Sequence, residues 1–315
     1  MTTLEAIAKM YKAYETTDNN EFRRKARVLQ SIWREERGYL IGEHYTPKYG
    51  SRVLGSRLEK AQAHDELLNY LTPTIRQVVR DEVINKKKSK GKLYSHPRIF
   101  DDLLSSQPLC FNLFGELQRN LSLATSVFTE LLPNRVSEVT GIEFEYSPGR
   151  GDLKYTGDRT AFDVYVTFKT LRNKEGFIGI EVKYHENLQG RASQHTTRYD
   201  DIARDMGCFK PESLVKLQRK PLQQLWRDHL LAGILRQVGG FADGIYTFLY
   251  PKDNLDCVQA VAKYRECLAY SSTFEGWTLE NITTAVKKHT KAKWIDDFTN
   301  RYLDFSKLGD IAARR

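Results

Sequence analysis

The sequence predicts an α/β fold with one core, whose elements follow the order helix, three strands, helix, strand around a central mixed sheet. Two observations predict this order. Apolar residues recur at helical spacing on both sides of a middle region, and within that region they alternate with period two. Further helical stretches at both ends of the sequence predict additions to the core.

The first part of the chain is expected to be helical. Residues 4–37 and 54–84 carry apolar side chains at helical spacing, and Pro73 breaks the second stretch because proline ends one element and can begin the next. Residues 111–132 form a further helical stretch. We therefore expect residues 1–108 to form a helical region packed on the core.

Strands are expected in the middle of the chain. Alternation with period two covers residues 142–146, 162–168 and 177–184. A helix over residues 222–238 and an apolar strand over residues 243–250 complete the core, and three further helices are predicted over 258–270, 279–289 and 294–305. We expect the core to span residues 109–252 and a helical C-terminal extension to span residues 253–315.

The composition favours a folded protein with a polyanionic partner. Lys and Arg total 49 against 40 Asp and Glu, so the formal net charge is +9. The four cysteines (Cys110, Cys208, Cys257 and Cys267) lack C-x-x-C spacing, which argues against a zinc ribbon or a redox motif. No signal peptide is visible, and no run approaches the roughly 20 apolar residues that cross a bilayer. A cytoplasmic location is expected.

A lysine run stands apart from this pattern. Residues 86–92 hold five lysines in seven positions and read as an exposed loop. The run is interpreted either as an arm that contacts phosphates or as a linker kept polar by charge.

The candidate chemistry lies on two successive predicted strands. Residues 162–168 and 178–184 both place large apolar side chains at even positions, so odd positions face the other way. Asp163 is odd on the first strand, and Glu181 and Lys183 are odd on the second. If the strands are hairpin neighbours, two carboxylates and an amine converge on one side of the sheet.

Convergent carboxylates repel each other unless a cation lies between them. Hard oxygen ligands select Mg²⁺ or Mn²⁺, which activate water and offset the charge that develops on a phosphate. The alternative is that Asp163, Glu181 and Lys183 form surface ion pairs on a solvated sheet face. Gly179 favours the first interpretation, because glycine in a strand often marks close approach of a backbone or a ligand.

These residues resemble the signature of the PD-(D/E)XK nuclease superfamily, in which an acidic residue on one strand precedes Glu/Asp-x-Lys on the next. Phe162-Asp163 stands where Pro-Asp is usual, and Glu181-Val182-Lys183 fits fully. The wider pattern, from Trp33-Arg34-Glu35 to Tyr250-Pro251, is similar to a subgroup of bacterial nucleases. The resemblance implies a restriction-endonuclease-like αβββαβ core, with Asp163, Glu181 and the Val182 carbonyl as metal ligands and Lys183 serving the water.

Four further residues are secondary candidates. Glu145 has the parity of Asp163 on the first strand and is either a further acidic ligand or an exposed strand carboxylate. Glu116 lies on the helix where some superfamily members place an extra acidic residue. Gln224 and Arg227 lie on the helix where related nucleases place a glutamine or basic residue near the site, and we expect them to contact substrate or water.

The sequence therefore predicts an Mg²⁺- or Mn²⁺-dependent deoxyribonuclease. Its expected partners are DNA and either a second copy of the chain or a partner defence subunit, with no membrane. Restriction or anti-phage defence is the expected setting, by fold-level analogy. The alternative is a non-catalytic nucleic-acid-binding subunit built on a nuclease-like core.

Overall fold

The computed structural model describes residues 3–46, 50–190 and 193–313. It contains two compact units. Unit 1 comprises Met1–Gly115 and Ala292–Arg315, and unit 2 comprises Glu116–Lys291. The boundary therefore differs from the expected one at residue 109, and the C-terminal segment divides between the two units.

Unit 2 is built on a five-stranded mixed sheet. Its strands lie in chain order, as β3 (Val136–Tyr146), β4 (Phe162–Thr170), β5 (Glu175–Val182), β6 (Asp243–Tyr250) and β7 (Phe274–Thr278). Pairing is antiparallel from β3 to β5 and parallel from β5 to β7. The predicted α/β fold is confirmed. The strand β7 was not predicted, because its five residues lie in a segment assigned to the helical extension.

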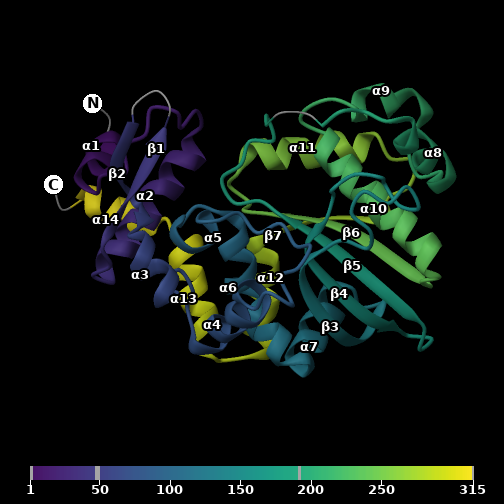
Figure 1. Cartoon of the computed structure of the whole chain (residues 1–315), viewed down its shortest axis with the longest axis horizontal. Helices are drawn as coiled ribbons and strands as arrows, with labels where there is room; N and C mark the ends of the chain where they lie inside the picture. The colour runs from purple at the N-terminus through teal and green to yellow at the C-terminus, as the bar shows by residue number, and fades with distance from the viewer. Residues whose placement is uncertain (1–2, 47–49, 191–192, 314–315) are drawn as a thin grey trace. The chain divides into compact units, whose positions relative to one another are not determined.

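Helices cover both faces of this sheet. Figure 1 shows α10 (Gln223–Gly239) and α11 (Leu255–Glu266) over one face and α7 (Leu121–Leu131) and α12 (Leu279–His289) over the other. Between β5 and α10 the chain forms α8 (Thr197–Met206), a 3₁₀ turn over Pro211–Ser213 and α9 (Leu214–Leu217). The β4–β5 hairpin therefore lies between two helical layers.

An apolar cluster holds helix α10 against the sheet, and a glycine ends the helix. Trp226, Leu230 and Tyr246 are fully buried in one apolar cluster with residues of β5 and α11. The helix ends at Gly240, whose φ of +65° is the left-handed conformation that glycine adopts without strain. Burial of this face, at about 25 cal/mol per Å² of apolar surface, fixes α10 against the sheet.

Strict alternation fails at the ends of β3 and β4. Tyr146 stacks on Tyr165 with 4.0 Å between ring centroids, and the Phe162 ring lies nearly parallel to Tyr165 at 6.2 Å. Tyr146 and Phe162 have even numbers, so strand alternation predicts them on the face opposite to Tyr165. Both rings instead pack with Tyr165. Glu145 has a φ of +50°, and this local change in backbone direction precedes Tyr146.

Unit 1 is mostly helical but not entirely so. Its helices are α1 (Thr3–Met10), α2 (Glu21–Glu36), α3 (Lys60–Asp65), α4 (Pro73–Val79), α5 (Arg98–Asp101), most of α6 (Ser106–Arg119), α13 (Lys293–Tyr302), α14 (Ser306–Ala313) and a π-helical turn, η1 (Arg80–Ile84). A hairpin of β1 (Ile41–Thr46) and β2 (Gly50–Leu58) interrupts them. The helix predicted from residue 54 is therefore wrong over 54–58, where cross-strand pairing outweighs a weak helical pattern.

No helix within the described residues is both long enough and apolar enough to cross a membrane.

Candidate active site

Asp163, Glu181 and Lys183 lie together where β4 and β5 separate. The ladder between these strands ends at the pair Val164 and Ile180. Beyond it, Asp163 Oδ2 accepts the backbone N–H of Val182 at 2.8 Å, and Lys183 Nζ lies 2.5 Å from Glu181 Oε1. The end of the hairpin therefore brings the three predicted residues into one site.

Two of these side chains are buried, and Asp163 is half-buried. Glu181 is 6% exposed and Lys183 is 9% exposed. Surface ion pairs are worth little because water screens both charges, whereas a buried pair is held in a fixed geometry. The burial of Glu181 and Lys183 thus contradicts the surface-pair alternative.

The site is electrostatically strained. Burial and the neighbouring Glu181 raise the pKa of the Asp163 carboxyl well above its ordinary value. Burial lowers the pKa of Lys183, but Glu181, Glu186 and Asp163 outweigh it, so the pKa of Lys183 is raised and the amine stays protonated. Two carboxylates repelling each other beside one ammonium form a site that a divalent cation would stabilise.

Helix α10 supplies a polar edge to the site, as the sequence predicted for Gln224. Its amide Nε2 donates to Glu181 Oε1 at 2.6 Å. One turn later on the same helix, Asp228 is 4% exposed and accepts a long hydrogen bond from the Tyr246 hydroxyl at 3.4 Å. Burial and Glu181 raise the pKa of Asp228.

Asp228 was not predicted from the sequence, although its spacing from Gln224 is a signal for it. Residues four apart lie on the same helix face, so an acidic residue at this distance from Gln224 faces the same way. Glu186 was also missed. Its Oε2 accepts the Tyr184 N–H at 2.7 Å, and the Asn254 side chain donates to the carbonyls of Tyr184 and Glu186 at 3.0 Å each. These bonds fix the segment that carries Lys183.

Arg227 is held by several hydrogen bonds, and its contact with substrate or water stays a prediction. Its guanidinium donates to Asp158 Oδ2 through Nε (3.0 Å) and Nη2 (2.7 Å), to Thr160 Oγ1 (2.6 Å) and to Ser193 Oγ (2.6 Å). These four bonds favour a positioning role over contact with substrate or water.

Asp158 is the centre of this network. Besides Arg227, it accepts hydrogen bonds from Thr156 Oγ1, the Thr160 N–H, Thr160 Oγ1 and the Tyr199 hydroxyl, at 2.6–2.9 Å. Burial raises the pKa of Asp158, but the Tyr199 hydroxyl and the Arg227 guanidinium outweigh it and hold this pKa far below its usual range. The network ties the β3–β4 loop, which leads into Asp163, to α8 and α10.

Replacing Asp158 with asparagine is expected to destabilise the protein by about 2 kcal/mol at pH 7, because the partly buried guanidinium of Arg227 loses its counter-charge. A carboxyl whose pKa is lowered on folding contributes stability above its unfolded pKa of about 4 and loses it as the pH falls further. Denaturation of both proteins from pH 7 to pH 2.5 should therefore show a difference that shrinks below about pH 4. The control Asp152→Asn, on an exposed residue of the same loop, should cost under about 0.5 kcal/mol; equal costs would contradict the network.

Two candidates remain, Glu145 and Glu116. Glu145 forms an ion pair with Arg150, whose Nη2 lies 2.6 Å from its Oε1, and its charge adds to the raised pKa of Asp163. Glu145 is thus close to the site, and its role as a ligand stays a prediction. Glu116 is half-buried on α6, and its role also stays a prediction.

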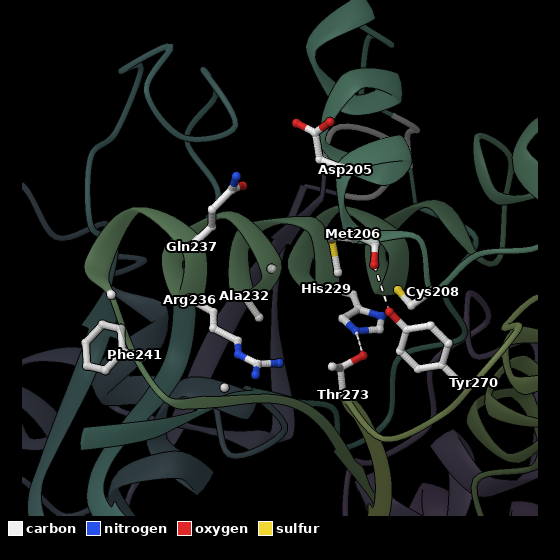
Figure 2. A pocket seen from close by; sticks show the side chains of 13 residues that line it. Asp205, Met206, Cys208, His229, Ala232, Arg236, Gln237, Phe241, Tyr270 and Thr273 are labelled. Atoms are coloured by element: carbon white, nitrogen blue, oxygen red, sulfur yellow. Dashed lines mark hydrogen bonds between the residues drawn. The ribbon is translucent and has the colours of Figure 1, made fainter. Parts of the chain in front are cut away.

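A cavity of about 510 Å³ lies elsewhere in unit 2, along the second half of α10. It is lined by Asp205, Met206, Cys208, His229, Ala232, Gly233, Arg236, Gln237, Gly240, Phe241, Gly244, Tyr270 and Thr273. Figure 2 shows the His229 ring bonded to Thr273, at 2.9 Å, and Tyr270 bonded to the Met206 carbonyl, at 2.8 Å. Burial lowers the pKa of His229 to about 3, so this imidazole is a neutral core group. None of the predicted site residues lines the cavity.

Comparison with known proteins agrees with the geometry. A family profile described as the PD-(D/E)XK nuclease superfamily matches residues 16–304. Comparison with curated proteins and with solved structures gave no match. The matched range includes the hairpin with Asp163, Glu181 and Lys183 and the helix with Gln224. The chain belongs to the PD-(D/E)XK nuclease superfamily.

Proposed function

We propose that this chain is a metal-dependent nuclease that hydrolyses phosphodiester bonds of DNA. The observation that carries the proposal is the convergence of two carboxylates, the half-buried Asp163 and the buried Glu181, beside the amine of Lys183. Family membership supports a nucleic-acid substrate. The choice of DNA is part of the proposal.

The donor set fits Mg²⁺ or Mn²⁺. Lys183 and Gln224 both donate to Oε1 of Glu181, and Val182 donates to Oδ2 of Asp163, so these bonds orient both carboxylates and leave acceptor capacity for a cation. Among residues 3–46, 50–190 and 193–313, no three His, Cys, Asp or Glu side chains are grouped as metal ligands. Mg²⁺ suits such a site, because it keeps several waters and binds through one or two carboxylates and substrate phosphates.

The residues of the chain divide the chemistry between them. Asp163, Glu181 and the carbonyl of Val182 would hold the cation, which supplies a Lewis acid and lowers the pKa of bound water. Lys183 pairs with Glu181 as an ammonium. This ammonium would stabilise charge that develops on the phosphate and orient the attacking water. Gln224 would hold the Glu181 carboxylate in place while Lys183 acts on the phosphate and the water.

Incubation of the purified chain with plasmid, duplex and single-stranded DNA tests the proposal. Cleavage is expected with Mg²⁺ or Mn²⁺, none with chelator, and full recovery after the metal is restored. Binding without cleavage under every metal condition would favour the alternative, a non-catalytic nucleic-acid-binding subunit.

Restriction or anti-phage defence is the setting we propose, on the strength of the family resemblance alone. Double-strand cutting by a chain with one site calls for two protomers, so a homodimer or a partner subunit is part of this proposal. Protection of a bacterial host from phage by the wild-type chain, lost with Asp163→Asn, is the expected result.

A further inference from the structure

The lysine run of unit 1 folds into a defined turn. Asn85 accepts the Lys87 N–H on its side chain and the Ser89 N–H on its carbonyl, both at 3.0 Å. The Lys92 N–H donates to the Ser89 carbonyl at 3.0 Å, and Gly91 has a φ of +83°, which glycine adopts without strain. The backbone of this segment is therefore ordered by its own hydrogen bonds.

One lysine of the run anchors the turn. Lys92 Nζ lies 2.7 Å from Oε2 of Glu82, and Glu82 is 8% exposed within the π-helical turn η1. This ion pair joins the two ends of the segment across ten residues. Lys92 thus has a structural role that the other four lysines do not share.

The other four are Lys86, Lys87, Lys88 and Lys90, here called the basic loop. All four are exposed, and no carboxylate among the described residues pairs with any of them. Four ammonium groups within five positions repel one another. A polyanion would offset this repulsion, because each phosphate neutralised releases a bound counterion.

We propose that the basic loop contacts the phosphate backbone of the nucleic-acid substrate. The inference rests on the proposed function, which supplies a polyanion as the ligand. The hydrogen-bonded backbone and the anchored Lys92 restrict the loop before binding, so less conformational freedom is lost on association. Lysine gives point-charge contacts, so this loop provides affinity and not sequence preference.

The salt dependence of binding tests the proposal. In one variant Lys86, Lys87, Lys88 and Lys90 become glutamine. In the control, four exposed lysines elsewhere (Lys174, Lys252, Lys263 and Lys291) become glutamine, which removes the same net charge. Affinity for a duplex and for single-stranded DNA is measured by fluorescence anisotropy from 50 to 300 mM KCl, in chelator so that no cleavage occurs.

The basic-loop variant should lose more than about tenfold in affinity at low salt. Its slope of log K against log salt should fall by up to about 3–4 for duplex and about 3 for single strands, since each phosphate contact contributes about 0.9 or 0.7. The control should change the slope by less than about 1. A lysine-to-arginine version of the loop should keep the wild-type slope, which separates lost charge from lost folding.

Equal slopes for the loop variant and the control would overturn the proposal. So would loop-dependent binding to vesicles with an anionic lipid surface together with an unchanged slope on DNA. If the wild-type chain binds DNA through the loop but cleaves under no metal condition, this inference stands and the proposed nuclease activity fails.

Discussion

Replacing Lys183 with methionine is expected to lower the single-turnover cleavage rate about a thousandfold, while DNA affinity changes by less than about threefold. Methionine keeps most of the buried volume but removes the ammonium that lies 2.5 Å from Glu181. Because this charge acts on the phosphate as charge develops there, its loss affects the rate more than substrate binding. Rapid-quench measurement at saturating enzyme gives the rate directly.

The matched control is Lys169→Met. Lys169 pairs with Glu175 at the other end of the same β4–β5 hairpin. Like Lys183, it is a lysine at one end of this hairpin that pairs with a glutamate, but it lies outside the site. Its rate should stay within about twofold of wild type, as is usual for a surface pair. A Lys183→Met rate within tenfold of wild type would rule out the role assigned to this amine.

Replacing Asp163 with asparagine is expected to remove cleavage and yet stabilise the folded chain. Asparagine retains an oxygen that can accept the Val182 N–H, so the end of the hairpin keeps this bond. It removes a half-buried carboxyl whose pKa is raised first by burial and then by the neighbouring Glu181. We expect a gain of roughly 0.5–2 kcal/mol in chelator, which is the usual size for a stabilising substitution. Thermal or urea denaturation measures it.

The same substitution at a paired carboxylate should have the opposite sign. Asp243 begins β6 and pairs with Arg135 through both carboxylate oxygens. Asp243→Asn should therefore destabilise the chain, by roughly 1–2 kcal/mol, because it breaks a partly buried bidentate pair. An equal loss in the free energy of unfolding for both variants would contradict the claim that Asp163 and Glu181 repel each other in the folded chain.

Much of the site could be predicted because strand alternation carries information over short distances. Each apolar face of residues 164–168 and 178–184 directs the intervening polar side chains to the other side, and the hairpin aligns the two strands. The prediction fails where the ladder ends. Phe162 turns towards Tyr165 there, because the neighbouring cluster on α10 offers its ring a buried position.

Gly179 shows the same limit. The sequence indicated close approach of a backbone or a ligand at this glycine. In the structure a Cβ at Gly179 would lie 2.5 Å from a ring carbon of Phe162, so an aromatic side chain fills the space. The sequence pattern of a strand identifies an unusual position, but it does not show which group packs against that position.

The residues that sequence reasoning missed depend on tertiary contacts. Asp228 and Glu186 take part in the site through elements far apart in the chain, namely Tyr246 on β6 and the Asn254 side chain. The strands β1, β2 and β7 were not predicted, because their sequences lack a clear alternation of large apolar side chains with period two. Whether such a segment forms a strand depends on pairing with a neighbouring strand, which a local sequence pattern does not show.

The binding of Mn²⁺ to the wild-type chain and to Asp163→Asn tests most directly whether the two carboxylates form a metal site. Titration calorimetry in the absence of DNA should show saturable binding by the wild type and a loss of at least about tenfold in affinity for Asp163→Asn. Binding by Asp243→Asn should equal that of the wild type. Equal Mn²⁺ affinity of the wild-type chain and Asp163→Asn would contradict the assignment of Asp163 and Glu181 as metal ligands.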